Sequence, residues 1–430
     1  MQISINANRC EPSPMRKFHP YAVKAKKAGK KIYHLNIGQP DLPTPKAYYE
    51  AIRSFDEKTL EYAESPGKPL LIDAIRNYYH GLGVDLDENE VLITTGGSEA
   101  LLLTCLSILD PYTEVIIPEP YYPNYTTFVH AAGGVIRALP TNPWEGYRYA
   151  KRERMESLIT KNTRAILITN PGNPTGVVLD QEEMRMIADI AKEHNLFLIC
   201  DEVYREFCYD DKFGVPTMAR FRDIDENLVI VDSVSKRYSE CGIRVGMVVT
   251  RNKEILEGIM HFCQSRLSPP LLGQIAAEAS IEGTELYSEE CFNEYKARRD
   301  FFIEGLNKIP GVYSPFPEGA FYTVASLPVK NAEDFCRWCL TDFCWKENGE
   351  EPEENGGIRF GGLIPGPEKK EPEFIGETVM MAPAAGFYAN KELGANQVRM
   401  AYVLKREDLA RALKVLEKAL EAYRKVEAGE

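Results

Sequence analysis

The sequence predicts an α/β fold: a large domain with a mostly parallel, seven-stranded sheet covered by helices on both faces, and a smaller α+β domain beside it. Short apolar runs alternate with amphipathic segments from about residue 90 to residue 250. The runs are apolar throughout, which is typical of parallel strands that are buried on both faces. They span residues 91–95, 114–118, 135–139, 165–170, 196–200, 228–233 and 245–250. Between them, segments such as 181–194 carry apolar side chains at helical spacing and predict the connecting helices.

The chain has 430 residues, which is more than one compact domain usually holds, so we expect two domains. The pattern changes after about residue 285: a long helix is predicted at 287–306, strands at 320–325 and 397–403, and a last helix at 406–426. The predicted parts are an N-terminal arm and helix at 1–45 that pack with the small domain, a large domain at 46–286, and the small domain at 287–430.

An acidic segment rich in glycine and proline occupies residues 346–377. This composition favours a surface insertion, because the segment has few apolar side chains to bury. The alternative is a lid over a functional site, anchored by Arg359, Phe360 and Ile364.

The composition excludes several classes of partner. A net charge of −13 and a pI near 5.2 argue against nucleic acid and against anionic membranes, since phosphates would be repelled. The N-terminus lacks an apolar signal core, and nowhere do about 18 apolar residues run together. The ten cysteines are scattered without a second C-x-x-C pair, so no metal site is predicted. We expect a cytoplasmic protein with free thiols.

Polar residues gather where the predicted strands end, and in an open α/β sheet those carboxyl ends carry the function. Lys236 follows the run at 228–233. A lysine amine acts as a nucleophile when burial or a nearby positive charge favours its neutral form. Ser233, Ser235 and Arg244, with glycines on both sides of the arginine, supply hydroxyl donors and a fixed cation for a phosphate.

Four other strand ends carry candidate ligand contacts. Asp201 is suited to cap a helix, to meet an arginine, or to pair with a protonated ring nitrogen, and Tyr204 would reach a phenolic oxygen on the same ring. Asn173 lies in a rigid Asn-Pro-Gly-Asn-Pro turn and offers an amide donor. Tyr122 is either a core aromatic or a ring that stacks on a flat cofactor. The segment Gly97, Ser98 and Glu99 opens a predicted helix, where backbone N–H groups bind phosphate.

These motifs together resemble one family. The segments NIGQPD, GGSEA, PYYPNY, NPGNPTG, DEVY, SVSK with GIRVG, and QVRMAYV resemble the class I and II aminotransferases, which have fold type I and depend on pyridoxal 5'-phosphate (PLP). The match runs in order from about residue 13 to the end of the sequence, and the chain looks most like sequences called aspartate aminotransferase.

The resemblance implies a role for each candidate. Lys236 would carry PLP covalently and move the substrate proton, Asp201 would keep the pyridine nitrogen protonated, and Asn173 and Tyr204 would bond the ring oxygen. Tyr122 would stack on the ring. The phosphate would be held by Ser233, Ser235, Arg244 and the backbone of Gly97, Ser98 and Glu99. Arg399, helped by the Gly38 backbone, would bind the substrate α-carboxylate, and Tyr62 would reach the phosphate in a neighbouring subunit, which requires a homodimer with shared active sites.

The resemblance leaves the substrate open. Aspartate with 2-oxoglutarate, in a ping-pong reaction, is the favoured pair of small-molecule substrates. Some dicarboxylate-specific relatives place a lysine where this chain has Ser98, so Arg16, Lys17 or Arg359 would have to supply a second cation. The alternatives are an aminotransferase for aromatic or alanine-type amino acids and a PLP-dependent C–S lyase or decarboxylase. A non-enzymatic regulator would need an appended DNA-binding segment, which we do not expect.

Overall fold

The computed structural model describes residues 1–210, 212–283, 285–347 and 372–429. Its centre is a seven-stranded sheet in the order β2-β8-β7-β6-β5-β3-β4. β8 runs antiparallel to both of its neighbours, and the other strands are parallel. The strands are β2 (Val91–Thr94), β3 (Glu114–Glu119), β4 (Val135–Pro140), β5 (Thr163–Thr169), β6 (Phe197–Asp201), β7 (Leu228–Ser233) and β8 (Gly246–Val249). Each of the seven predicted runs is a strand of this sheet, so the predicted fold class is confirmed.

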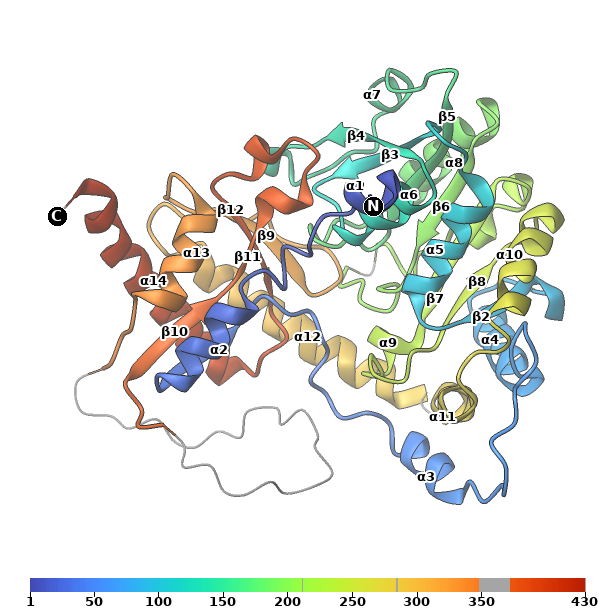
Figure 1. Cartoon of the computed structure of the whole chain (residues 1–430), viewed down its shortest axis with the longest axis horizontal. Coiled ribbons are helices and arrows are strands. Elements are labelled where there is room, and N and C mark those ends of the chain that lie inside the picture. Colours follow the sequence, from blue (N-terminus) through green and yellow to red (C-terminus); the bar gives the residue numbers. More distant parts are fainter. Residues whose placement is uncertain (211, 284, 348–371, 430) are drawn as a thin grey trace.

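Both faces of the sheet are buried, and successive side chains of a strand enter different cores. Along β5, Ile166 and Ile168 join one apolar cluster, whereas Ala165 and Leu167 join another. This alternation follows from the two-residue repeat of a strand. Helices cover the two faces, as Figure 1 shows. They include α4 (Pro69–Gly81), α5 (Gly97–Ile108), α6 (Asn124–Ala131), α8 (Gln181–Glu193), α10 (Lys253–Ser265) and α11 (Leu271–Glu282).

The α8 helix illustrates how the sequence sets these elements. Its N-cap, Asp180, accepts the backbone N–H of Glu183, and the Glu183 side chain accepts the N–H of Asp180 in return. This capping box satisfies two N–H groups that the first helical turn leaves without a partner. Met184, Ile187 and Ala191 then face the sheet at helical spacing.

A third apolar cluster lies around two smaller sheets. One has the order β11-β12-β9, and in the other β1 pairs in parallel with β10. These elements lie on the left of Figure 1 with the helices that cover them, one of which runs on into the middle of the view. They are β1 (Lys30–His34), β9 (Tyr322–Ser326), β10 (Gly376–Met380), β11 (Ala382–Pro383), β12 (Gln397–Ala401), α2 (His19–Lys27), α12 (Glu285–Leu306), α13 (Ala332–Thr341) and α14 (Arg406–Ala428).

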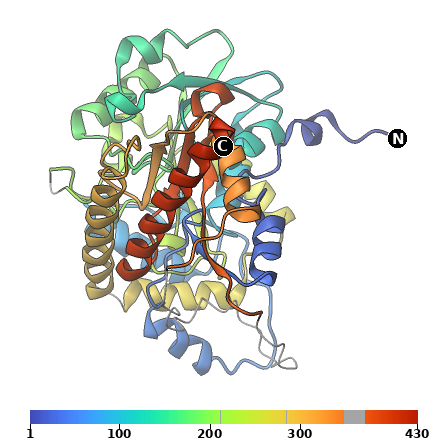
Figure 2. The same ribbon diagram turned by 90° about the vertical axis from the view of Figure 1, so that its left-hand side faces the viewer.

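The N-terminal segment crosses between these groups. Its first helix, α1 (Ile5–Arg9), contacts α6: the Asn6 amide donates to the Ala131 carbonyl at 3.3 Å, and the Arg9 guanidinium donates to the Gly134 carbonyl at 3.2 Å. Its outermost residues extend away from the rest of the molecule (Figure 2). The remaining helices are α3 (Lys46–Ser54), α7 (Arg152–Glu156) and α9 (Val234–Arg237).

The structure bears on two further predictions. No helix within the described residues combines the length and the apolar character needed to cross a membrane. Most of the predicted insertion at 346–377, including Arg359, Phe360 and Ile364, lies outside the described residues. At the far end of that segment, Gly376 and Glu377 already belong to β10.

Candidate active site

Lys236 lies in α9, a one-turn helix that begins where β7 ends. The Ser233 hydroxyl caps this helix and accepts the backbone N–H of Ser235 at 3.3 Å. The Lys236 amine donates to the Gly38 carbonyl at 3.0 Å and lies 3.5 Å from the Cys241 sulfur. Burial lowers the pKa of the amine, whereas the phenol and thiol groups around it raise that pKa, and the net shift is upward. The amine must therefore lose a proton before it can act as a nucleophile or a base.

Asp201 lies at the end of β6 and is buried. Its Oδ2 accepts a 2.6 Å hydrogen bond from the Tyr125 hydroxyl, which also lies 2.5 Å from the Thr169 hydroxyl. Its Oδ1 accepts the Val203 N–H at 3.3 Å. Burial raises the pKa of the Asp201 carboxyl from 3.8 to about 6, although the bonds from Tyr125 and Val203 act in the opposite direction. A buried carboxylate that lacks a cation is stabilised by a protonated ring nitrogen.

Tyr204, Asn173 and Tyr322 form a second polar group beside Lys236. The Tyr204 hydroxyl accepts the Asn173 amide N–H at 3.5 Å and lies 2.9 Å from the Tyr322 hydroxyl. Tyr322 in turn donates to the Gly38 carbonyl at 3.1 Å, the same carbonyl that Lys236 contacts. The Asn173 Oδ1 is buried without a hydrogen-bond partner. An unpartnered buried amide oxygen is costly for the free protein and is expected where a ligand binds.

Sequence reasoning missed Tyr125 and Tyr322. Tyr125 is the last residue of the PYYPNY segment, three residues after Tyr122 and therefore on the same side of a helical turn, which is the only signal the sequence offers. Tyr322 lies in an apolar strand whose pattern predicts a core residue. Its role is visible only once β9 lies beside Gly38 and Tyr204.

An anion cradle lies at the start of α5, where Gly96 has φ +76° and Gly97 begins the helix. A side chain at Gly96 would lie 2.4 Å from the Arg244 guanidinium, so glycine lets that cation reach the helix end. The Glu99 N–H donates to the Gly96 carbonyl at 3.1 Å, and the Glu99 carboxylate pairs with Arg266 at 3.2 Å. The free first-turn N–H groups that suit a phosphate are therefore those of Gly97 and Ser98.

Arg399 projects from β12 and is only 2% exposed. It donates to the Asn36 carbonyl at 2.5 Å, and its guanidinium lies 4.7 Å from the centre of the Tyr322 ring. Within the described residues no carboxylate pairs with Arg399, and its Nε has no hydrogen-bond partner. Burial lowers the pKa of the guanidinium. A buried arginine in this state is suited to bind a carboxylate.

Tyr122 is close enough to Lys236, Arg399 and Asp201 for their charges to act on the pKa of its phenol. Burial has the largest effect on that pKa and raises it. Its hydroxyl accepts the Asn124 amide N–H at 2.7 Å. Tyr62, in contrast, is 78% exposed, so within one chain it lies away from the site.

The comparisons with known proteins agree with this geometry. The family described as aminotransferase class I and II matches residues 30–360. The chain belongs to the class I and II aminotransferases. It is 31% identical, over 91% of each chain, to an aspartate aminotransferase of Pyrococcus horikoshii. This aminotransferase also resembles solved structures titled alanine aminotransferase from Pyrococcus furiosus (28% identity, 98% and 100% of the two chains, TM-score 0.83) and aspartate aminotransferase from Thermus thermophilus with maleate (25% identity, 97% and 100%, TM-score 0.81).

Class I and II aminotransferases use PLP, and the residues of this aminotransferase fit that cofactor. The buried Asp201 carboxylate suits a ring nitrogen, and the Asn173 amide N–H, which donates to the Tyr204 hydroxyl at 3.5 Å, suits a ring oxygen beside it. Arg244 and the Gly97 end of α5 suit the phosphate. Each of these groups matches a different part of one flat, phosphorylated ring.

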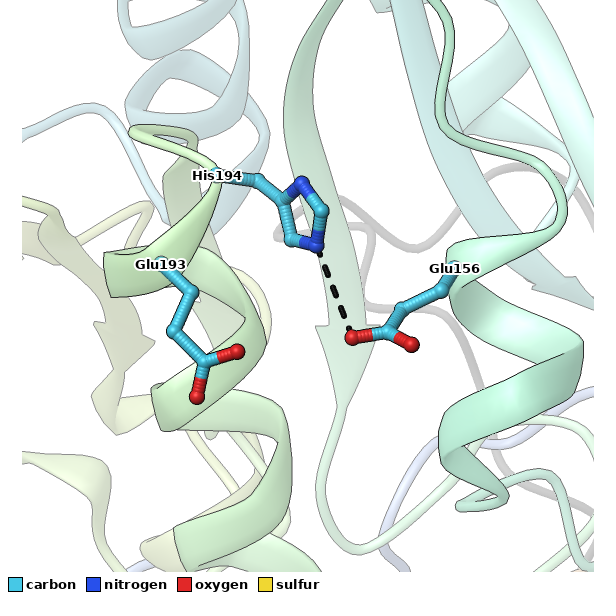
Figure 3. Close-up of side chains that lie close together, drawn as sticks. All are labelled: Glu156, Glu193 and His194. Carbon is cyan, nitrogen blue, oxygen red and sulfur yellow. Dashed lines mark ion pairs between the residues drawn. The ribbon is translucent and has the colours of Figure 1, made fainter.

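A group with metal-ligand chemistry lies elsewhere, at Glu156, Glu193 and His194 (Figure 3). The His194 Nε2 lies 3.5 Å from Glu156. Arg152 pairs with both carboxylates, at 2.7 Å and 2.8 Å. Because Arg152 already forms ion pairs with both carboxylates, we interpret the group as an ion-pair cluster that links α7 to the end of α8.

Of the cations that the sequence offers for a substrate side chain, Lys17 is already engaged, since its amine lies 2.5 Å from Glu333. Arg16 is exposed, and Arg359 lies outside the described residues.

Replacing Tyr322 by phenylalanine tests the residue that the sequence did not reveal. The variant keeps the ring beside Arg399 but removes the hydroxyl that meets Tyr204 and Gly38. We expect kcat/KM to fall by about 10-fold, the value of roughly one hydrogen bond in a buried site. Steady-state kinetics measure it, with Tyr112→Phe at an exposed tyrosine as the matched control. Equal kinetics for the two variants would show that the Tyr322 hydroxyl takes no part.

Proposed function

We propose that this aminotransferase binds PLP at Lys236 and transfers the amino group of an L-amino acid, preferably aspartate, to 2-oxoglutarate. The observation that carries the proposal is Arg399, a buried guanidinium without a carboxylate partner among the described residues. Its guanidinium lies 4.7 Å from the centre of the Tyr322 ring, and the Tyr322 hydroxyl and the Lys236 amine both donate to the Gly38 carbonyl. A site of this kind binds an α-carboxylate and brings the adjacent carbon within reach of a base.

In this proposal each of the protein's own groups has a separate role. PLP supplies an electron sink for the bond that breaks at the substrate α-carbon. The Lys236 amine would take the proton from the substrate α-carbon and return it to the carbon on the other side of the substrate nitrogen. Asp201 holds a proton on the ring nitrogen, and Tyr125 and the Val203 N–H keep its carboxylate oriented. Tyr204 and Asn173 bond the ring oxygen, while Arg244 with the start of α5 holds the phosphate.

We expect Arg399→Lys to weaken the use of every amino-acid substrate. Lysine keeps the charge but cannot form two parallel hydrogen bonds to a carboxylate. The loss of one charge-assisted bond lowers kcat/KM by roughly 10- to 100-fold. PLP affinity should stay unchanged, because Arg399 faces the substrate rather than the phosphate. Kinetics and PLP titration measure the two effects, with the exposed Arg424→Lys as control. An unaltered kcat/KM, or a loss confined to PLP binding, contradicts the assignment.

The two half-reactions use the same groups in opposite directions, so we expect ping-pong kinetics. Amino acid enters, its keto acid leaves, and the acceptor keto acid then takes the amino group at the same site. Initial rates at several fixed 2-oxoglutarate concentrations should give parallel double-reciprocal lines. Intersecting lines would exclude this order.

The substrate preference rests on the relatives rather than on a second cation. Several curated relatives are named aspartate aminotransferase, and one solved structure is titled alanine aminotransferase. The test is a panel of aspartate, alanine and phenylalanine as donors to 2-oxoglutarate, followed by the loss of PLP absorbance in single turnovers. We expect aspartate to be best. Aspartate no better than the other two overturns the choice. Pyruvate plus ammonia formed from a cysteine-type substrate without a keto-acid acceptor would indicate a lyase.

The exposure of Tyr62 supports a homodimer with shared sites. A tyrosine at 78% exposure in a segment between α3 and α4 is available to a second copy. If it reaches the phosphate of the partner subunit, Tyr62→Phe should raise the dissociation constant of PLP by about 5-fold, the value of roughly one hydrogen bond. Tyr112→Phe is the matched control, because Tyr112 is 76% exposed. A monomer in solution, or unchanged PLP affinity, contradicts this assignment.

A further inference from the structure

A buried group of charges lies directly behind the active site. The Arg205 guanidinium donates to Glu202 at 3.0 Å and 2.5 Å and to Asp232 at 3.3 Å. The Arg237 guanidinium donates to the same Asp232 oxygen at 2.8 Å. All four side chains are at most 3% exposed. We call Glu202, Arg205, Asp232 and Arg237 the charge network.

Each member of the charge network is the chain neighbour of a proposed site residue. The pairs are Asp201 and Glu202, Tyr204 and Arg205, Ser233 and Asp232, and Lys236 and Arg237. Along extended backbone, neighbouring side chains point to opposite sides, so Ser233 faces the site where Asp232 faces away from it. The ion pairs that Asp232 makes with Arg205 and Arg237 therefore connect the segment after β6, the end of β7 and the turn that holds Lys236.

The arginines of the charge network are held by two tyrosines of α4. The Arg237 guanidinium lies 4.1 Å from the centre of the Tyr78 ring. Arg205 donates to the Tyr79 hydroxyl at 2.8 Å and to the Tyr78 hydroxyl at 3.2 Å. Such packing lowers the cost of burying the cations and fixes their orientation.

The carboxylates of the charge network act on the site electrostatically. Asp232 and Glu202 both raise the pKa of Asp201, in addition to its burial. Each carboxylate is paired with an arginine, which offsets its field. If one arginine lost its charge, the charge network would carry an excess negative charge close to Asp201, in a region of low dielectric.

We propose that Arg205 and Arg237 are positioning residues of the aminotransferase: they neutralise the two carboxylates behind Asp201 and fix the turn that carries Lys236. Neither arginine touches PLP or substrate; both act through their chain neighbours. The proposal rests on the function proposed above, because it concerns the same lysine and carboxylate.

The test uses the PLP-loaded enzyme and follows the absorbance of bound PLP as the pH is varied. Arg237→Gln keeps a hydrogen-bond donor without the charge. Asp232 then retains Arg205 as a cationic partner, but Asp232 and Glu206 both lose the charge of Arg237, and the added negative field favours protonation of the bound chromophore. We expect the midpoint of the transition to move up by about one pH unit, the usual effect of one nearby charge. Arg237→Met is measured alongside, so that the result does not depend on the folding of one variant. The exposed Arg222→Gln is the control and should not shift.

The double variant Arg237→Gln/Asp232→Asn separates charge from packing. It removes both charges of the pair, so we expect the midpoint to return to within about 0.3 pH units of the wild type. A single variant that titrates like the wild type, or a double variant shifted as far as the single one, overturns the proposal. A wild-type protein whose absorbance shows no bound PLP would instead refute the proposed function.

Discussion

Lys236→Ala should lose nearly all transaminase activity, by about 10⁴-fold or more, because it removes the covalent attachment and the proton-moving base together. The variant should still fold and still bind PLP, since the phosphate cradle at Gly97 and Arg244 is untouched. The measurement is the rate of keto-acid formation from aspartate and 2-oxoglutarate, with the exposed Lys308→Ala as the matched control.

Chemical rescue separates a catalytic role of Lys236 from a structural one. Removal of the side chain leaves space beside the Gly38 carbonyl, which the amine contacts at 3.0 Å. A small primary amine such as methylamine fits there and supplies a base. We expect activity to rise with its concentration. A variant with near wild-type turnover, or one that no amine restores, would count against the mechanism.

Asp201→Asn is expected to change activity and stability in opposite directions. Asparagine keeps an oxygen for the Tyr125 hydroxyl but has no charge to hold a proton on the ring nitrogen. We expect kcat to fall by about 10³-fold, as when a group that stabilises transition-state charge is lost. The PLP-free protein, in contrast, should become more stable at pH 7, because it no longer buries a carboxylate.

The direction of this change in stability follows from the raised pKa of Asp201. The folded protein holds this proton up to about pH 6, whereas an unfolded chain releases it near 3.8. The protonated carboxyl contributes its full stability when the pH is below the pKa of Asp201 in the unfolded chain. This contribution is lost as the pH rises through the pKa of Asp201 in the folded protein. Above pH 6 the ionised carboxylate costs about 3 kcal/mol in the PLP-free protein.

Thermal unfolding of the PLP-free proteins from pH 4 to pH 8 measures this effect. The advantage of Asp201→Asn over the wild type should grow between pH 4 and pH 6 and then become constant. The exposed Asp110→Asn, at a side chain 73% exposed, should show no such trend. A difference in melting temperature that does not vary with pH would rule out the buried carboxylate as its cause.

Most of the sheet and much of the site could be predicted from the sequence, for a physical reason. The strands are buried on both faces, so their apolar runs are uninterrupted and end where polar residues begin. Lys236, Asp201 and Asn173 lie at three such ends. Parallel strands bring their carboxyl ends to the same edge of the sheet, so residues far apart in sequence gather at one site.

The sequence did not reveal the contacts of certain tyrosines and arginines, because these residue types have several common roles in proteins. Tyr322 lies 118 positions from Tyr204, and a tyrosine in an apolar strand predicts a core position. Arg205 and Arg237 resemble ordinary charged residues, because nothing local marks them as buried partners of Asp232. Only the folded chain shows that Tyr322 contacts Tyr204 and that both arginines pair with Asp232.

The central claim, that Lys236 carries the cofactor, is tested most directly by fixing PLP to the protein. Borohydride reduction of the PLP-loaded enzyme makes the linkage permanent and blocks tryptic cleavage at the modified lysine. We predict that mass spectrometry finds the added group on a peptide of residues 223–237, since cleavage after Arg222 and Arg237 leaves Lys236 inside it. Peptide 223–236 without the added group, or PLP found on a different lysine, would contradict the claim.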